Sequence, residues 1–117
     1  RYMNSKSRSA SAGPLYDAVH LAGFTEGDRA LEKVILSEFC ANTRLSVSEL
    51  ESDRSSRSWG EAFHRLKGAA KAVGVWSIAN WCDVAENQPD MASEEKAELF
   101  ARILSLIEKI ELHIERF

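Results

Sequence analysis

The chain has 117 residues, of which 44% are apolar and 28% are charged, and its formal net charge is −3 at pH 7. This length and composition are typical of one globular domain with a modest core of its own. No stretch of about eighteen apolar residues is present, so we expect no direct membrane insertion. The acidic balance argues against nucleic acid as a partner.

The two cysteines, Cys40 and Cys82, lie far apart, and each falls within an apolar helical pattern. Their spacing is not that of a metal-binding or redox pair, and the chain shows no secretory signal pattern. We therefore expect two small buried thiols in a cytoplasmic protein, with no disulfide and no metal site.

The first thirteen residues, RYMNSKSRSASAG, are rich in serine, carry three basic side chains and contain almost no apolar ones. We interpret residues 1–13 as a disordered linker or an expression remnant, and residues 14–117 as the folded domain.

Beyond residue 14 the apolar side chains recur at helical spacing. Residues 15–21 predict a short first helix or a capping segment, which ends at Gly23. A long helix is expected to follow an N-cap at Thr25 or Asp28, because either side chain can accept a hydrogen bond from the first turn. Its apolar side chains recur at steps of three and four, namely Leu31, Val34, Ile35, Phe39, Leu45 and Leu50.

Residues 51–58 form a polar stretch that predicts a turn before the next helix. Ser58 is a candidate N-cap, with Glu61 at the capping-box position three residues later. We therefore expect the third helix to cover residues 59–73 and to end at Gly74, where glycine is favoured after a helix.

A shorter helix is expected over residues 76–87, and Pro89 then breaks the chain. The last helix begins at Ser93 and keeps its apolar spacing as far as Ile114. No strand pattern competes with this one. The sequence predicts an all-α fold, namely an antiparallel four-helix bundle with a short additional N-terminal helix.

His64 lies on the polar side of the third predicted helix. At about 100° per residue, six apolar residues of this helix fall within about 60° of the pole opposite His64. These residues are Trp59, Ala62, Leu66, Ala69, Ala70 and Val73. We therefore expect the imidazole to face solvent on the same side as Lys67 and Lys71. Such a ring is suited to act as a nucleophile that is presented to another protein.

The sequence from residue 64 to residue 86 reads HRLKGAAKAVGVWSIANWCDVAE. This segment resembles the histidine-containing phosphotransfer (HPt) domain of two-component phosphorelays. The family pattern has histidine, lysine, glycine, two small residues, a second glycine, an aliphatic residue and often a cysteine. Those places hold His64, Lys67, Gly68, Ala69, Ala70, Gly74, Ile78 and Cys82. Two departures concern packing: Val75 stands where alanine is frequent, and Ala85-Glu86 replaces Leu-Glu.

The resemblance implies a histidine phosphotransfer module in which His64 accepts a phosphoryl group from the aspartate of a response-regulator receiver domain. A second receiver, or the first one, takes the group away. The module is then a phosphoryl carrier rather than an autonomous enzyme and has no cofactor of its own, because Mg²⁺ sits in the acidic pocket of the receiver.

The resemblance also implies a context for the module. It is expected to be the C-terminal module of a hybrid sensor kinase or a free-standing HPt protein. The linker-like start favours these over the N-terminal domain of a chemotaxis-type kinase. Within a longer kinase it would share a histidine kinase assignment and a tether to the inner membrane. Expected partners are receiver domains and a histidine kinase in the same or another chain, and we expect a monomer.

The residue chemistry agrees with this interpretation. Imidazole attacks phosphorus only when it is neutral, and an isolated ring with a pKa of about 6.5 is roughly three-quarters neutral at pH 7. We expect Lys67 and Lys71 to favour the neutral ring by like-charge repulsion. The same ammonium groups would then offset the charge of the phosphoryl group.

Gly68 costs its helix about 1 kcal/mol relative to alanine, and its phase is about 40° from His64, so core packing does not explain it. We interpret it as a bare spot that lets the backbone of a partner approach the ring. Gly60 is either a second bare spot or a residue tolerated near the helix start. Charged residues on the same side are docking candidates: Arg57 and Arg65 as rim charges, and Glu61, which either orients His64 or caps the helix.

The alternative is a helical docking module, a pseudo-HPt domain that binds receivers and is never phosphorylated. The joint presence of His64, Lys67 and Gly68 argues against it. His20 and His113 lack such neighbours, and we expect His113 to be a surface residue.

Overall fold

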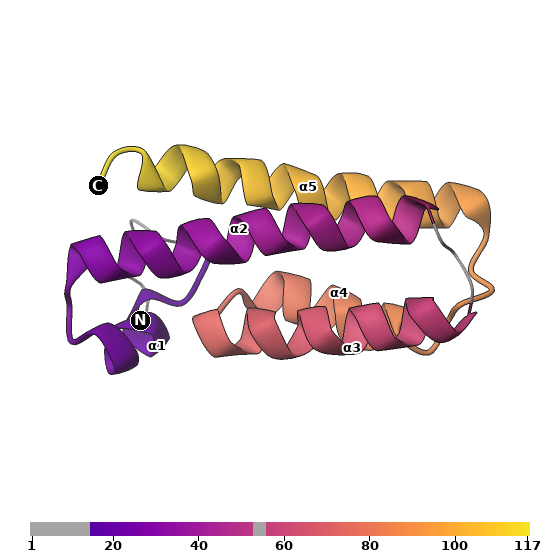
Figure 1. The fold of residues 1–117 in the computed structure, drawn as a ribbon, viewed down its shortest axis with the longest axis horizontal. Helices are drawn as coiled ribbons and strands as arrows, with labels where there is room; N and C mark the ends of the chain where they lie inside the picture. Colours follow the sequence, from indigo (N-terminus) through magenta and orange to yellow (C-terminus); the bar gives the residue numbers. More distant parts are fainter. Residues whose placement is uncertain (1–14, 53–55) are drawn as a thin grey trace, which may run out of the picture.

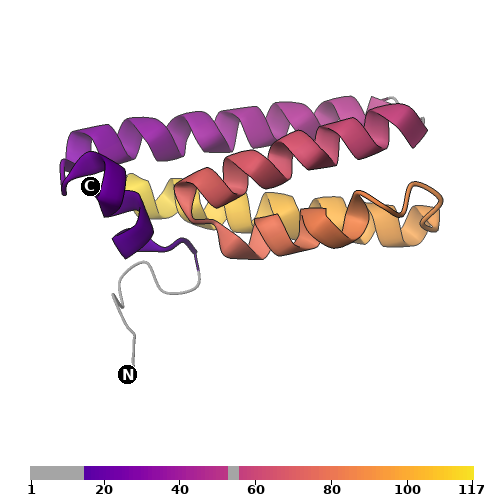
Figure 2. The same cartoon turned by 90° about the horizontal axis from the view of Figure 1, so that it is seen from below.

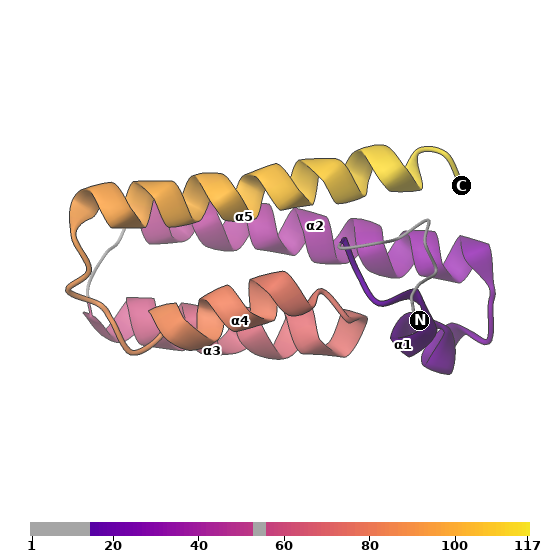
Figure 3. The ribbon, with the colours of Figure 1, turned by 180° about the vertical axis from the view of Figure 1, so that it is seen from behind.

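The computed structural model describes residues 15–52 and 56–117, and within these ranges all regular structure is helical. The helices are α1 (Ala18–Thr25), α2 (Arg29–Ser52), α3 (Ser56–Val73), α4 (Trp76–Ala85) and α5 (Ser93–Ile114). In Figures 1 and 3, α2 lies beside α5 and α3 beside α4, and successive long helices run in opposite directions. The predicted all-α bundle with a short additional N-terminal helix is confirmed. The proposed linker, residues 1–13, lies outside the described residues.

The short helix α1 begins and ends later than predicted. It begins at Ala18 because the Asp17 carboxylate caps it by accepting a hydrogen bond from the His20 N–H at 3.0 Å. It continues through Gly23 as far as Thr25. A methyl group built at Gly23 would meet nothing within 4 Å. Figure 2 shows α1 at the end of the bundle where α5 finishes.

Helix α2 has the predicted N-cap, because the Asp28 carboxylate accepts a hydrogen bond from the Leu31 N–H at 3.0 Å. Its apolar face was predicted only in part. Leu31, Val34 and Leu45 are exposed, since steps of three and four describe two stripes on this long helix. The buried stripe consists of Leu36, Phe39, Cys40, Thr43, Val47 and Leu50.

Helix α3 begins at Ser56, three residues before the predicted start. Ser58 and Glu61 therefore lie inside the helix, and the predicted N-cap and capping box are wrong. The preceding polar run contains no glycine or proline that would delay the helix.

The predicted end of α3 is confirmed. Gly74 has a positive φ of 83°, its N–H donates to the Lys71 carbonyl, and the Val75 N–H donates to the Ala70 carbonyl at 2.9 Å. These two bonds form a Schellman motif, which turns the chain sharply into α4.

Helix α4 ends at Ala85, two residues before the predicted end, and α5 begins at Ser93 as predicted. The Ala92 N–H donates to the Glu95 carboxylate at 3.3 Å and so stabilises the first turn of α5. The buried face of α5 carries Phe100, Ile103, Ile107, Ile110 and Ile114.

The core contains an aromatic cluster formed by α3 and α5. Trp59, Phe63 and Phe100 are buried, and the ring centroids of Trp59 and Phe63 are 4.7 Å apart. The Trp59 Nε1–H donates to the Ala85 carbonyl oxygen at 2.6 Å. This bond ties α3 to the end of α4, so the residue after Ala85 is brought to the exposed side of α3.

Cys40 and Cys82 are free and buried, which confirms the prediction of two small buried thiols. Burial is the main reason that the pKa of each thiol rises to about 12. Within residues 15–52 and 56–117, no helix has the length and apolar character needed to span a membrane.

Candidate functional site

The imidazole of His64 projects from the middle of α3 into solvent, and its side chain is 71% exposed. The opposite face of α3 buries the predicted apolar residues Trp59, Ala62, Leu66, Ala70 and Val73. Ala69 is an exception, because it is exposed at the edge of the groove between α2 and α3. The position of the ring therefore matches the helical phase predicted from the sequence.

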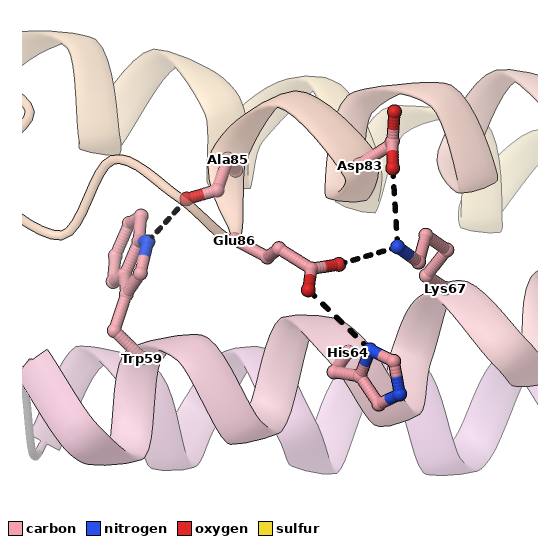
Figure 4. Close-up of polar contacts among 6 residues, drawn as sticks. All are labelled: Trp59, His64, Lys67, Asp83, Ala85 and Glu86. Atoms are coloured by element: carbon pink, nitrogen blue, oxygen red, sulfur yellow. Dashed lines mark hydrogen bonds and ion pairs between the residues drawn. The ribbon is translucent and has the colours of Figure 1, made fainter.

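One nitrogen of the His64 ring is held by Glu86, which directly follows α4 (Figure 4). His64 Nδ1 lies 3.3 Å from Glu86 Oε2. An ionised carboxylate can only accept a hydrogen bond, so this contact requires the proton to be on Nδ1. In the neutral ring, Nε2 then carries the lone pair, and Figure 4 shows Nε2 on the side of the ring away from Glu86.

Lys67 lies one turn after His64 and contacts two carboxylates of the α4 region. Its Nζ is 2.6 Å from Glu86 Oε1 and 3.1 Å from Asp83 Oδ1. The hydrogen bond to Glu86 and then that to Asp83 raise the pKa of Lys67 above its usual 10.5. The hydrogen bond from Lys67 is the main reason that the pKa of Glu86 lies below its usual value. Lys67 and Glu86 are therefore charged at neutral pH.

Glu86 thus uses its two oxygens for two different neighbours, since Oε1 contacts Lys67 and Oε2 contacts His64. The Glu86 side chain is 18% exposed, whereas that of Asp83 is 66% exposed. Glu61 was expected either to orient His64 or to cap the helix, and Glu86 was recognised only within the family pattern. In the structure, the carboxylate that contacts the ring belongs to Glu86.

The like-charge repulsion expected of Lys67 is offset in the structure by these two carboxylates. Lys71 is exposed on the same side of α3, one turn beyond Lys67. Whether either ammonium supports a phosphoryl group stays a prediction.

The surface beside His64 is open. A methyl group built at Gly68 would meet nothing within 4 Å, whereas one at Gly60 would lie 3.6 Å from the Glu86 carbonyl oxygen, an ordinary contact. An open hollow next to the ring is lined by Gly60, Glu61, His64, Arg65, Glu86 and Asn87. Four predicted site residues, His64 included, therefore surround one hollow. Arg57 belongs to α3, and its side chain lies outside the described residues.

The other two histidines are engaged in packing. His20 Nε2 lies 3.2 Å from the Ala72 carbonyl oxygen, and its ring packs edge-on against Trp76 at 5.0 Å. His113 is half-buried between the rings of Tyr16 and Phe117, so the expected surface position is modified by packing on both sides of the ring. The reason is that the segment before α1 and the chain end after α5 enclose this ring.

Within residues 15–52 and 56–117, no group of three or more His, Cys, Asp or Glu side chains is arranged to hold a metal ion. Carboxylates near His64 instead contact an ammonium and an imidazole.

Comparison with known protein families shows to which family this helical fold belongs. The sequence pattern of the Hpt domain matches residues 34–113, more than half of the chain, and the match includes α3, α4 and most of α2 and α5. The chain belongs to the Hpt domain family. Hpt domains are histidine phosphotransfer modules of phosphorelays, and receiver domains are the general kind of partner with which they interact. Neither curated proteins nor solved structures give a significant match to this Hpt domain.

Proposed function

We propose that His64 is the residue of this Hpt domain that accepts the phosphoryl group, through Nε2, from the aspartyl phosphate of a receiver domain. The group then passes to the aspartate of another receiver or returns to the first. The observation that carries the proposal is the position of this ring, which is 71% exposed in mid-helix with Nδ1 held by Glu86.

The proton on Nδ1 suits the ring to this chemistry. The Nε2 lone pair attacks phosphorus, the P–O bond to the aspartate breaks, and the electron pair of that bond leaves with the carboxylate. The ring becomes cationic as the N–P bond forms, and the nearby Glu86 carboxylate stabilises that charge through the Nδ1–H hydrogen bond. The reverse transfer follows the same path.

Lys67 and Lys71 offset the charge of the bound phosphoryl group in this proposal. Lys67 does so while it keeps its close contact with Glu86, and Lys71 contributes from the exposed side of the helix. The module remains a phosphoryl carrier, and Mg²⁺ belongs to the acidic pocket of the receiver.

The receiver docks over the open side of α3 in this proposal. Gly68 lets its backbone approach the ring, and Gly60, Glu61 and Arg65 line the hollow beside His64. Arg57 is a further rim charge. The interface is small and transient, because the carrier has to release one partner before it meets the next. The domain acts as a monomer, within a hybrid sensor kinase or free-standing.

Transfer of radioactive phosphate from a phosphorylated receiver tests the proposal. We expect label on the wild-type protein that is labile to acid and stable to base, and no label on His64→Gln. Because His64 is exposed, the variant should keep the wild-type helical content and melting temperature, which circular dichroism checks. Equal labelling of His64→Gln would show that the acceptor is another residue. Binding of the receiver without any labelling of the wild-type protein would favour the pseudo-HPt alternative.

A further inference from the structure

Lys67 is shared between two carboxylates that differ in their surroundings. Glu86 is mostly covered and lies 2.6 Å from Lys67 Nζ, whereas Asp83 is 66% exposed and lies 3.1 Å away. Figure 4 shows that Asp83 approaches the ammonium from α4, on the side away from His64. An ion pair with an exposed partner is weak and exchanges readily, so Asp83 is the partner that Lys67 can give up.

The carboxylates that contact Lys67 outnumber its single positive charge. Lys67 contributes one positive charge, and Asp83 and Glu86 together contribute two negative ones. A lysine ammonium has three hydrogens; Lys67 donates one to Asp83 Oδ1, and Glu86 Oε1 lies 2.6 Å from the same nitrogen. When a phosphoryl group with nearly two negative charges is attached to Nε2, Asp83 both competes for Lys67 and repels the group.

We propose that Asp83 is a positioning residue that restrains Lys67 and thereby weakens the hold of this Hpt domain on its phosphoryl group. The inference rests on the proposed function of His64. A carrier has to discharge as readily as it loads, and a competing carboxylate shifts the transfer equilibrium toward the receiver. Asp83 acts through Lys67 and touches neither the ring nor the phosphoryl group.

The test compares Asp83→Asn with Glu98→Gln in the full chain. Glu98 lies on α5, is 72% exposed and pairs only weakly with Arg102 at 3.7 Å, so it is matched in charge and exposure. The first measurement is the equilibrium ratio of phosphorylated Hpt domain to phosphorylated receiver. The second is the rate of phosphorylation by phosphoramidate, in which the P–N bond of the donor breaks, ammonia leaves and the N–P bond to His64 forms.

We expect Asp83→Asn to raise both the equilibrium ratio and the phosphoramidate rate by roughly threefold to tenfold, with Glu98→Gln close to wild type. The increase should shrink at high salt, because Asp83 is exposed. In a Lys67→Gln background the increase should be smaller, since only direct repulsion remains to be removed.

No change, or a decrease, in Asp83→Asn would overturn the inference. An increase with the receiver but not with phosphoramidate would assign Asp83 to docking and would also overturn it. Asp83→Ser serves as a second variant if Asp83→Asn fails to fold. Failure of the proposed function is distinguishable, because the wild-type protein would then acquire no phosphate on His64 from either donor.

Discussion

The surface around His64 and the junction at the C-terminal end of α3 contain the same kinds of residue in opposite surroundings. Around His64 the ring is exposed and Gly68 faces open space. At the junction, His20 packs against Trp76, and a methyl group built at Gly74 would lie 3.1 to 3.2 Å from Asp17 and His20 atoms. One region leaves a histidine and a glycine accessible to a partner, and the other packs them against neighbouring residues of the domain.

At the junction, Asp17 is hydrogen-bonded to residues in α1, in the turn between α3 and α4, and in α4. The Asp17 carboxylate accepts hydrogen bonds from the His20 N–H and from Trp76 Nε1–H, while the Asp17 N–H donates to the Gly74 carbonyl at 2.8 Å. These bonds join α1 to the turn between α3 and α4. A histidine or glycine in a helical domain therefore indicates a site only when its surroundings leave a reactive atom or open space unused.

The two glycines give the largest expected difference between the regions. Gly74→Ala should lower the free energy of unfolding by about 1–3 kcal/mol, because φ is positive and neighbouring atoms must move. Gly68→Gln should leave stability unchanged or raise it by up to about 1 kcal/mol, because Gln favours a helix. The same Gly68→Gln change should slow transfer from a receiver, since its side chain fills the open space beside His64.

Urea unfolding measures the first pair of effects, and rapid-quench transfer kinetics measure the last. Gly74→Ala serves as the kinetic control, because it lies outside the proposed docking surface. If both variants were equally stable and transferred phosphate at the wild-type rate, the distinction between the surface around His64 and the junction would be unfounded.

The helices and the exposure of His64 could be predicted from the sequence because they depend on local periodicity. The end of α3 at Gly74 depends on local backbone chemistry and was predictable for the same reason. The contacts of Glu86 and Asp83 were not predicted, although both residues lie within the recognised segment. They join α3 to the α4 region across 22 and 16 positions, and they depend on how α4 is rotated against α3.

The outer side of α2 shows a second limit. Leu31, Val34 and Leu45 follow helical steps as well as the core residues do, yet they are exposed. Periodicity alone does not decide which of two apolar stripes faces the other helices. That choice is made by packing against α3 and α5.

Neutralising Glu86 and neutralising Asp83 should change the rate of phosphoryl transfer in opposite directions. Glu86→Gln removes the charge that holds Nδ1–H, so we expect transfer to slow by about fivefold to thirtyfold. Asp83→Asn is expected to have the opposite sign, although it removes the same charge from the same region. Phosphoramidate kinetics on both variants check this, and equal directions of change would refute the separate roles.

The smallest expected effect concerns His113, whose ring packs against Tyr16, the residue before Asp17. Burial first, and the charges of Arg29 and Arg116 second, lower the pKa of this ring below its usual 6.5. The unfolded chain therefore binds the proton more readily than the folded one. The stability that the neutral ring contributes is fully present above pH 6.5, and it is lost as the pH falls from 6.5 toward the folded pKa.

His113→Phe keeps an aromatic ring between Tyr16 and Phe117 but cannot titrate. Between about pH 8 and about pH 5 the melting temperature of the wild-type protein should therefore fall more steeply than that of the variant. The two proteins differ only at residue 113, so the difference between the two curves isolates His113. Parallel curves would mean that solvent reaches this ring freely, and its packing between Tyr16 and Phe117 would then not shift its pKa.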